Sequence, residues 1–268
     1  MVVIPARGGS KTILKKNIKS YLGKPLICHS IDQSLELLND GLVDDVVLTT
    51  DSAEIATVVR DYSSKVWIPF YRPASISEDL STDLEFFDHL LEYLDENHPE
   101  KRPDILIHLR PTYPYRSVQV IKDALLTYSK VYNDYDCLRT VFKWEGKSPL
   151  KMFTLSPTGA LDPLRTEIYG VSEPYNMPRQ ILPEVYSCNG YLDIIKRTTI
   201  TEKRSVSGIK IFPWKMTSDK IDDIDDEKQW AESEQKQIME LKAKELKAKE
   251  IRDSKIREIK IRGLKIEE

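Results

Sequence analysis

The sequence predicts an α/β fold with a mostly parallel sheet. Through the first two thirds of the chain, short apolar runs rich in β-branched residues alternate with amphipathic helical patterns, which is typical of βαβ units. Hydrophobic residues make up 40% of the 268, enough for a buried core. Ligands of such sheets bind beyond the carboxyl ends of the strands, so we expect a site in the loops after Ile4, Thr50, Ile68 and Leu109.

Each predicted element rests on the period of its apolar residues. The first run, 2–4, ends at the turn-rich segment 5–10. Apolar residues three and four positions apart, such as Leu84, Phe87 and Leu91, indicate helices. The predicted strands are 2–4, 43–50, 66–68 and 105–109, and the predicted helices are 26–38, 53–62, 83–94 and 118–130.

The pattern becomes irregular between residues 139 and 201. Prolines break this stretch into short pieces, and strand-like runs resume only weakly at 191–195 and 208–213. We therefore expect 139–201 to be an inserted subdomain of short strands and long loops. The prolines are Pro149, Pro157, Pro163, Pro174, Pro178 and Pro183.

The composition changes again near the C-terminus, which divides the chain into a body, 1–235, and a tail, 236–268. The tail is rich in Lys and Glu, and its apolar residues recur every five positions, starting at Leu241. A step of five rotates by about 140° on a helix, so these residues form no single stripe, and a heptad coiled coil is not indicated. The pattern predicts a solvated helix or a partly disordered tail, with an oligomerisation or partner helix as the alternative.

Composition and cysteine usage exclude several classes of protein. No apolar stretch approaches the roughly 18 residues of a membrane span, and the first ten residues do not form a secretory signal. Cys28, Cys137 and Cys188 have neither disulfide-framework nor zinc spacing, which favours a reducing, cytoplasmic setting. The net charge of −3 gives no signature of nucleic-acid binding.

The loop after the first strand, 5–17, has the composition of an oligophosphate cradle. Two glycines allow close backbone approach, and Arg7, Lys11 and Lys16 supply positive charge. It matches neither a Walker A loop nor GxGxxG. A basic surface turn is the alternative.

Two further segments carry candidate chemistry. Asp223 and Asp225 alternate within 221–226, and paired carboxylates near an oligophosphate suit Mg²⁺, although an acidic helix-capping loop has the same composition. Segment 109–116 places two arginines and a hydroxyl in a proline-bounded loop, which suits a carboxylate or phosphate, with a structural turn as the alternative.

Taken together, IPARGGSK with the following KN, RPT-x-P-x-R, and DID followed by Trp230 and Glu234 resemble the acylneuraminate cytidylyltransferase family, from residue 2 to about residue 234. These are the CMP-sialic acid synthetases and relatives that act on other 2-keto sugar acids. The resemblance implies a Rossmann-like nucleotidyltransferase fold in three layers and an inserted subdomain that mediates a homodimer. It also implies the reaction, in which CTP and a sugar acid give a CMP-sugar and pyrophosphate.

Motif positions carry the family's site residues onto this chain. Catalytic roles fall to Arg7, Lys16 and Asp223, and Mg²⁺ binding to Asp223 and Asp225. The resemblance assigns nucleotide binding to Ala6, Arg7, Gly8, Ser10, Lys11, Asn17, Arg72 and Ser81. It assigns the sugar side to Arg110, Thr112, Arg116, Arg179, Gln180 and Asn189. No side chain stands out as a general base.

Several positions depart from the family pattern and keep alternatives open. Thr12 replaces a usual Gly, Gln229 a usual Asp, and Arg110 a usual Gln in a motif where Tyr113 and Tyr115 also differ. The alternatives are a cytidylyltransferase for Kdo, legionaminic or pseudaminic acid, and a nucleotide-binding protein without catalysis. RNA binding through the tail is disfavoured because 240–268 has no aromatic residue for base stacking.

Overall fold

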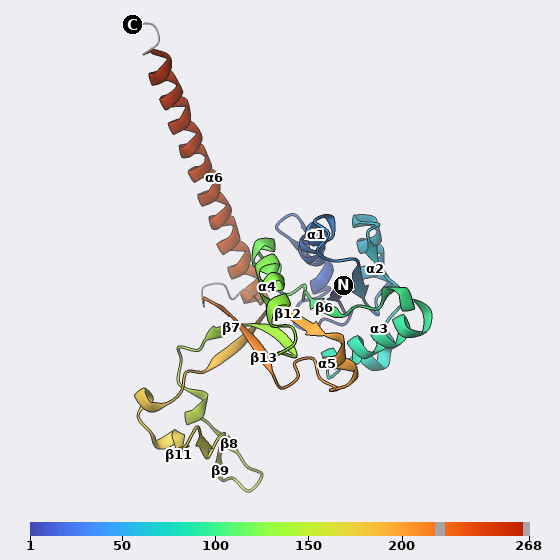
Figure 1. Cartoon of the computed structure of the whole chain (residues 1–268), viewed down its shortest axis with the longest axis vertical. Helices are drawn as coiled ribbons and strands as arrows, with labels where there is room; N and C mark the ends of the chain where they lie inside the picture. The colour runs from blue at the N-terminus through green and yellow to red at the C-terminus, as the bar shows by residue number, and fades with distance from the viewer. Residues whose placement is uncertain (218–222, 265–268) are drawn as a thin grey trace.

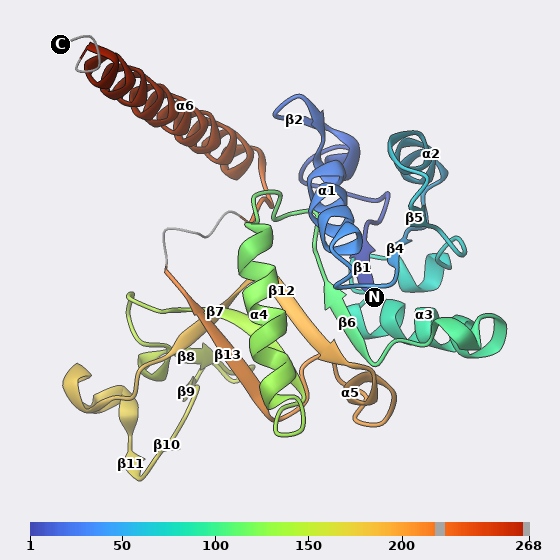
Figure 2. The same cartoon turned by 45° about the horizontal axis from the view of Figure 1, so that its top comes forward.

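A mixed seven-stranded sheet forms the centre of the protein in a computed structural model that describes residues 1–217 and 223–264. The strand order is β13-β7-β12-β6-β1-β4-β5; Figure 1 shows the whole chain and Figure 2 labels all seven strands. Only β12 runs antiparallel to its neighbours within this sheet, which confirms the predicted mostly parallel α/β class. The strands are β1 (Val2–Pro5), β4 (Val46–Thr49), β5 (Val66–Trp67), β6 (Ile105–His108), β7 (Cys137–Lys143), β12 (Tyr186–Lys196) and β13 (Ile211–Met216).

Helices cover both faces of the sheet and give the predicted three layers. In β1, Val2 and Ile4 pack into the core shared with α1, α2 and α4, whereas Val3 packs toward α3 and α5. This alternation is the period of two expected of a strand buried on both faces. The helices are α1 (Leu26–Asn39), α2 (Ala53–Tyr62), α3 (Asp83–Asn97), α4 (Val118–Val131), α5 (Arg197–Thr201) and α6 (Glu227–Leu264).

The helices that the periodicity predicted are confirmed, and local caps fix two of their starts. Ser52 accepts a hydrogen bond from the N–H of Ile55 to cap α2, and Thr82 and Glu85 form a capping box at α3. Short elements complete the chain. They are the strands β2 (Ser20–Tyr21), β3 (Lys24–Pro25), β8 (Phe153–Leu155), β9 (Leu161–Pro163), β10 (Glu167–Ile168) and β11 (Val171–Ser172), and the 3₁₀ turns Lys16–Ile18, Ala74–Ile76, Pro99–Lys101, Pro149–Lys151, Pro174–Asn176 and Arg179–Ile181.

The irregular stretch projects from the sheet, but its boundaries differ from the predicted 139–201. Strands β7 and β12 pair with each other from Cys137 to Lys143 and both lie within the central sheet. Residues 197–201 form α5, whose Ile200 is buried in the core. The projecting part is therefore 144–185, which carries the four short strands β8, β9, β10 and β11 at the edge of the molecule (Figure 2). The sequence analysis included β7 and most of β12 in the irregular stretch, because β7 ends shortly before the prolines and β12 begins shortly after them.

The tail is helical, as one of the two predicted alternatives stated, and it is continuous with the body. Helix α6 begins at Glu227, before the predicted boundary at 235. Trp230 packs edge-on against Tyr21 at 5.3 Å between ring centroids, and the Tyr21 hydroxyl lies 2.6 Å from Ser233 Oγ. Glu234 Oε1 accepts a hydrogen bond of 3.2 Å from the N–H of Leu22. The first turns of α6 thus belong to the body.

Beyond residue 237 the helix leaves the body (Figure 1). Leu241, Leu246 and Ile251, the five-residue repeat, are exposed by 43%, 63% and 50%. No helix among the described residues is both long enough and apolar enough to cross a membrane.

The first turns of α6 pack on the body, whereas Leu241, Leu246 and Ile251 are exposed, so we expect changes in the two parts to differ in their effect on stability. A chain ending at Met239 should unfold at nearly the same temperature as the full chain, because the removed residues whose side chains the structure describes are exposed. Trp230→Ala should cost about 3–5 kcal/mol, the usual loss for a buried Trp, because its ring is 4% exposed. Thermal unfolding of both variants checks this, and equal losses in the two would contradict it.

Candidate active site

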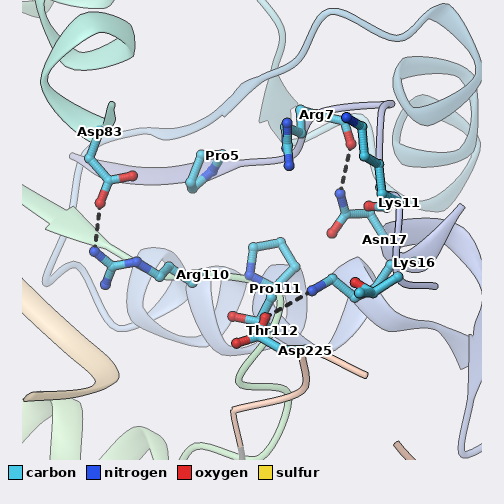
Figure 3. A pocket seen from close by; sticks show the side chains of 12 residues that line it. Pro5, Arg7, Lys11, Lys16, Asn17, Asp83, Arg110, Pro111, Thr112 and Asp225 are labelled. Carbon is cyan, nitrogen blue, oxygen red and sulfur yellow. Dashed lines mark hydrogen bonds and ion pairs between the residues drawn. The ribbon is translucent and has the colours of Figure 1, made fainter. Parts of the chain in front are cut away.

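A cavity of about 290 Å³ opens at the carboxyl ends of β1 and β6, where loop 6–17, loop 109–116 and segment 223–226 meet (Figure 3). This is the edge at which parallel sheets bind ligands. Eight of the predicted site residues line it, although they come from three separate segments. The lining residues are Pro5, Arg7, Ser10, Lys11, Thr12, Lys16, Asn17, Asp83, Arg110, Pro111, Thr112 and Asp225.

The first of these segments, loop 6–17, turns tightly around the end of β1. The N–H of Gly8 donates to Asp51 Oδ1 at 2.8 Å, and Asn17 Nδ2 donates to the carbonyl of Arg7 at 3.0 Å. A Cβ at Gly8 would approach Ser52 Cβ to 3.0 Å, so glycine is needed for close packing there. Asn17 therefore holds the loop. Ala6 is 2% exposed, and its N–H donates to the carbonyl of Thr49 at 3.0 Å.

The loop's cations already have carboxylate partners. Arg7 Nη1 lies 2.8 Å from Asp79 Oδ1, and Lys11 pairs with the same carboxylate. The side chains of Arg7 and Asp79 are about one third exposed, at 35% and 38%. Ion pairs this exposed are weak, so the oxygens of a triphosphate can displace Asp79 from both cations.

Lys16 is the most enclosed cation of the cavity. Lys15 adopts the left-handed region (φ 52°) and starts a 3₁₀ turn that directs Lys16 inward. The Lys16 side chain is 11% exposed. Its Nζ donates to the carbonyl of Ile224 at 2.9 Å and to Asp225 Oδ1 at 3.2 Å. A cation is thereby fixed between the two predicted motifs, which are about 200 residues apart in sequence.

Segment 223–226 is anchored from both sides. The N–H of Ile224 donates to the carbonyl of Thr112 at 2.8 Å, and the Ile224 side chain is buried with Trp230. Gln229, at a position where the resembling family has Asp, accepts hydrogen bonds from the N–H groups of Asp225 and Asp226 at 2.7 and 3.1 Å. Gln229 thus replaces a charged cap with a neutral one. Asp222, the other acid of the motif, lies outside the described residues.

The donor set of this segment fits Mg²⁺. Burial raises the pKa of Asp223, and the neighbouring Asp225 raises it further, against a lowering hydrogen bond from Thr112. A cation beside the two carboxylates would favour their charged forms and so offset the rise in the pKa of Asp223. Among the described residues no group of three or more acidic, His or Cys side chains gathers as a metal cage. Two carboxylates suffice, because Mg²⁺ in nucleotide sites takes its remaining ligands from phosphates and water.

A second cavity of about 230 Å³ adjoins the first and shares Pro5, Arg7 and Asp83 with it. It is lined by two further predicted nucleotide residues, Arg72 and Ser81, whereas Ala6 and Gly8 line neither cavity. Arg72 Nη2 donates to the carbonyl of Thr49 at 2.7 Å, and its guanidinium lies over the Phe86 ring at 5.2 Å. Burial lowers the pKa of Arg72. The predicted nucleotide residues thus flank Arg7 on both sides.

Two predicted sugar-side residues make structural contacts instead of lining the cavity. Arg116 is 6% exposed, and its Nη1 donates to Ser30 Oγ at 3.1 Å and to Gln33 Oε1 at 3.3 Å. Burial lowers the pKa of Arg116 to about 9. Asn189 Oδ1 accepts a hydrogen bond of 3.1 Å from the N–H of Tyr191. Arg116 holds loop 109–116, and Asn189 holds a bulge in β12.

Arg179 and Gln180 lie away from this cavity, in the projecting subdomain 144–185. Both are exposed. Arg179 instead lines a separate cavity of about 190 Å³ with Trp144 and Glu184. The structure therefore does not bring these two residues to the site of their own chain.

Two acidic residues near the cavity were missed by sequence reasoning. Arg110 Nη2 lies 2.7 Å from Asp83 Oδ2, and its Nη1 lies 2.8 Å from Asp193 Oδ2. Asp83 is the first residue of α3, where an acid is unremarkable. Asp193 gave a signal, since it is the one charged residue in the apolar run 191–195, and a buried charge in a strand needs a partner.

The chain is similar to known cytidylyltransferases along most of its length. A family model described as Cytidylyltransferase matches residues 1–239. A pseudaminic acid cytidylyltransferase of Campylobacter jejuni is 37% identical over 124 residues, which are 46% of this chain and 50% of that protein. An N-acylneuraminate cytidylyltransferase of Streptococcus agalactiae is 28% identical over 226 residues, 83% of this chain and 49% of that protein. The chain thus spans about half the length of these curated relatives.

A solved structure shows the same fold. It is a CMP:2-keto-3-deoxy-manno-octonic acid synthetase complexed with CTP, and it matches with a TM-score of 0.60 at 16% identity. The match covers 89% of this chain and 98% of that one. The predicted Rossmann-like nucleotidyltransferase fold is therefore confirmed.

Proposed function

The chain belongs to the cytidylyltransferase family, and from that premise we propose that it transfers CMP from CTP to the anomeric hydroxyl of a 2-keto sugar acid, releasing pyrophosphate. The observation that carries the proposal is the convergence of Arg7, Lys11 and Lys16 with Asp225 on one cavity at the sheet's ligand-binding edge. A sialic acid-like sugar is the main candidate. Kdo, legionaminic and pseudaminic acids are the alternatives.

The residues of the cavity support an in-line transfer governed by charge. The sugar hydroxyl attacks the α-phosphorus, and pyrophosphate leaves on the opposite side. Arg7 and Lys11 exchange Asp79 for phosphate oxygens, and Lys16 stabilises the charge that develops on the leaving group. Lys16 is already held by the Ile224 carbonyl and Asp225, so it needs little reorganisation to meet the transition state.

Asp223 and Asp225 would hold Mg²⁺ in this scheme. The bound ion neutralises phosphate charge and lowers the pKa of a coordinated hydroxyl. On the sugar side, Arg110 and Thr112 line the same cavity as Lys16. In this proposal the sugar lies between loop 109–116 and the nucleotide.

Arg179 and Gln180 fit this function only in a homodimer. Both are exposed on the projecting subdomain, away from their own cavity. We propose that this subdomain reaches the partner's site and brings them to the sugar there. A cytoplasmic setting, inferred from the cysteine usage, and a role in cell-surface glycan synthesis, implied by the family resemblance, complete the proposal.

Pyrophosphate release tests the proposal. The chain is incubated with Mg²⁺, each of CTP, UTP, ATP and GTP, and a panel of 2-keto sugar acids. We expect release only with CTP and a sugar acid present together. Release with GTP in place of CTP would contradict the assignment of the base, and no release with any sugar would favour a binding protein without catalysis.

A further inference from the structure

Arg110 is held between two carboxylates at the wall of the cavity. Asp83 and Asp193 each take one of its terminal nitrogens, at 2.7 and 2.8 Å. The side chains are exposed by 38% in Asp83, 21% in Arg110 and 5% in Asp193. The pair Arg110–Asp83 therefore faces the cavity, and Asp193 lies behind it. Figure 3 shows Asp83 and Arg110 joined at one side of the pocket.

The charges of this cluster are already balanced. Asp193 also binds Arg139, whose Nε lies 2.9 Å from Asp193 Oδ1, so two guanidinium groups meet two carboxylates. His108 lies behind them with Nδ1 3.8 Å from Asp193 Oδ2. Burial and the neighbouring arginines hold the pKa of His108 well below its usual value, so it adds no charge.

The charge balance of the cluster and the occupied nitrogens of Arg110 determine which group of a substrate Arg110 can bind. Each terminal nitrogen already holds one carboxylate oxygen, and a substrate carboxylate that took the remaining N–H groups of Arg110 would lie beside Asp83, whose like charge repels it. A third carboxylate beside the intact cluster would have no matching cation and would pay for its desolvation. A neutral hydrogen-bonding group adds no charge and meets N–H groups of Arg110 that remain available.

The Arg110–Asp83 pair offers a donor and an acceptor side by side. Asp83 binds Arg110 through Oδ2, and its Oδ1 makes no hydrogen bond with the described residues. A hydroxyl both accepts and donates at one oxygen. It therefore matches this pair better than a group that only accepts.

We propose that Arg110 and Asp83 together recognise a hydroxyl of the sugar, and not its carboxylate, and that Asp193 is the positioning residue that fixes Arg110. The hydroxyl oxygen accepts from Arg110 and its proton is donated to Asp83. The inference rests on the proposed function, and it adds that the specificity of this wall is for a neutral group.

Steady-state kinetics of Asp83→Ala test the proposal with the best sugar acid and a series of its single-deoxy analogues. We expect the KM for the sugar to rise about tenfold, the lower end of what loss of a charge-assisted hydrogen bond causes. The KM for CTP should change less than the KM for the sugar, because the hydrogen bond that Asp83 would lose is the one to the sugar hydroxyl. With one deoxy analogue, the variant and the wild type should have nearly equal KM values. Asp193→Asn should show the same dependence on that one hydroxyl.

Asp88→Asn is the matched control, because Asp88 lies on the same helix, pairs with Arg204 and lines neither cavity. This variant should change neither the KM for the sugar nor the KM for CTP. A fall in the sugar KM for Asp83→Ala would overturn the proposal, because it would mean that Asp83 occupies the place of the substrate carboxylate. An equal rise with every deoxy analogue would also overturn it, by showing a purely structural role.

Calorimetry separates this inference from the proposed function. The sugar acids are titrated into the chain with CTP and EDTA, so that binding is measured without turnover. If the wild type binds a sugar acid but releases no pyrophosphate, the proposed reaction fails while the affinity ratios still test the hydroxyl assignment. A wild type that binds no sugar acid would overturn both.

Discussion

Asp223→Asn should lower turnover at least about 100-fold with the fold intact, as loss of a group that stabilises transition-state charge does. The expectation follows from the proposed metal site: Asp223 is half-buried, it neighbours Asp225, which lines the cavity, and it lies close enough to Lys16 for that charge to affect its pKa. The amide has nearly the same shape, so thermal unfolding should change little. Initial rates of pyrophosphate release across a range of Mg²⁺ concentrations measure the loss.

Glu227→Gln is the control for Asp223→Asn. Glu227 lies four residues further along the chain, at the start of α6, where it is exposed and pairs with Lys19. Its variant should keep the wild-type rate. If Asp223→Asn kept a rate within tenfold of wild type at saturating Mg²⁺, Asp223 would not be a metal ligand.

Lys16→Met should reduce kcat/KM for CTP by about 100-fold or more, because it removes an enclosed charge that no neighbouring side chain replaces. The methionine keeps most of the apolar stem. It loses the hydrogen bonds to the Ile224 carbonyl and to Asp225. The variant should therefore also be somewhat less stable, which the unfolding temperature reports separately from the kinetics.

Lys15→Gln is the matched control for Lys16→Met. Lys15 is the preceding residue in the same loop, with a side chain 56% exposed and paired with Glu54. It carries the same charge but lies outside the cavity lining. We expect its variant to retain kcat/KM for CTP within about twofold, since exposed ion pairs contribute little. Equal losses in the two variants would mean that only the loop's overall charge matters.

The sequence predicted best those elements whose residues interact locally. Helix α3 was predicted because its apolar residues repeat at helical spacing, and the structure adds a capping box of Thr82 and Glu85 at its start. Loop 6–17 was predicted because glycines and cations stand close together in the chain. In both cases the physical cause lies within a few residues.

Elements that depend on distant partners were harder to predict. Strand β12 alternates polar and apolar residues only in part, because a bulge between Cys188 and Asp193 shifts its register against β7. Arg116 had the residue type of a substrate ligand, yet Ser30 and Gln33 from α1 take its nitrogens. Such contacts join positions more than 80 apart, so spacing along the chain carries no trace of them.

The fate of a label on the α-phosphate of CTP tests the proposed function most directly. The chain is incubated with α-labelled CTP, Mg²⁺ and a 2-keto sugar acid, and the products are separated. We predict that the label moves into a CMP-sugar while the released pyrophosphate stays unlabelled, because the sugar hydroxyl attacks the α-phosphorus. Label that remains in CTP with every sugar acid, or that appears only as free CMP, would contradict transfer to the sugar.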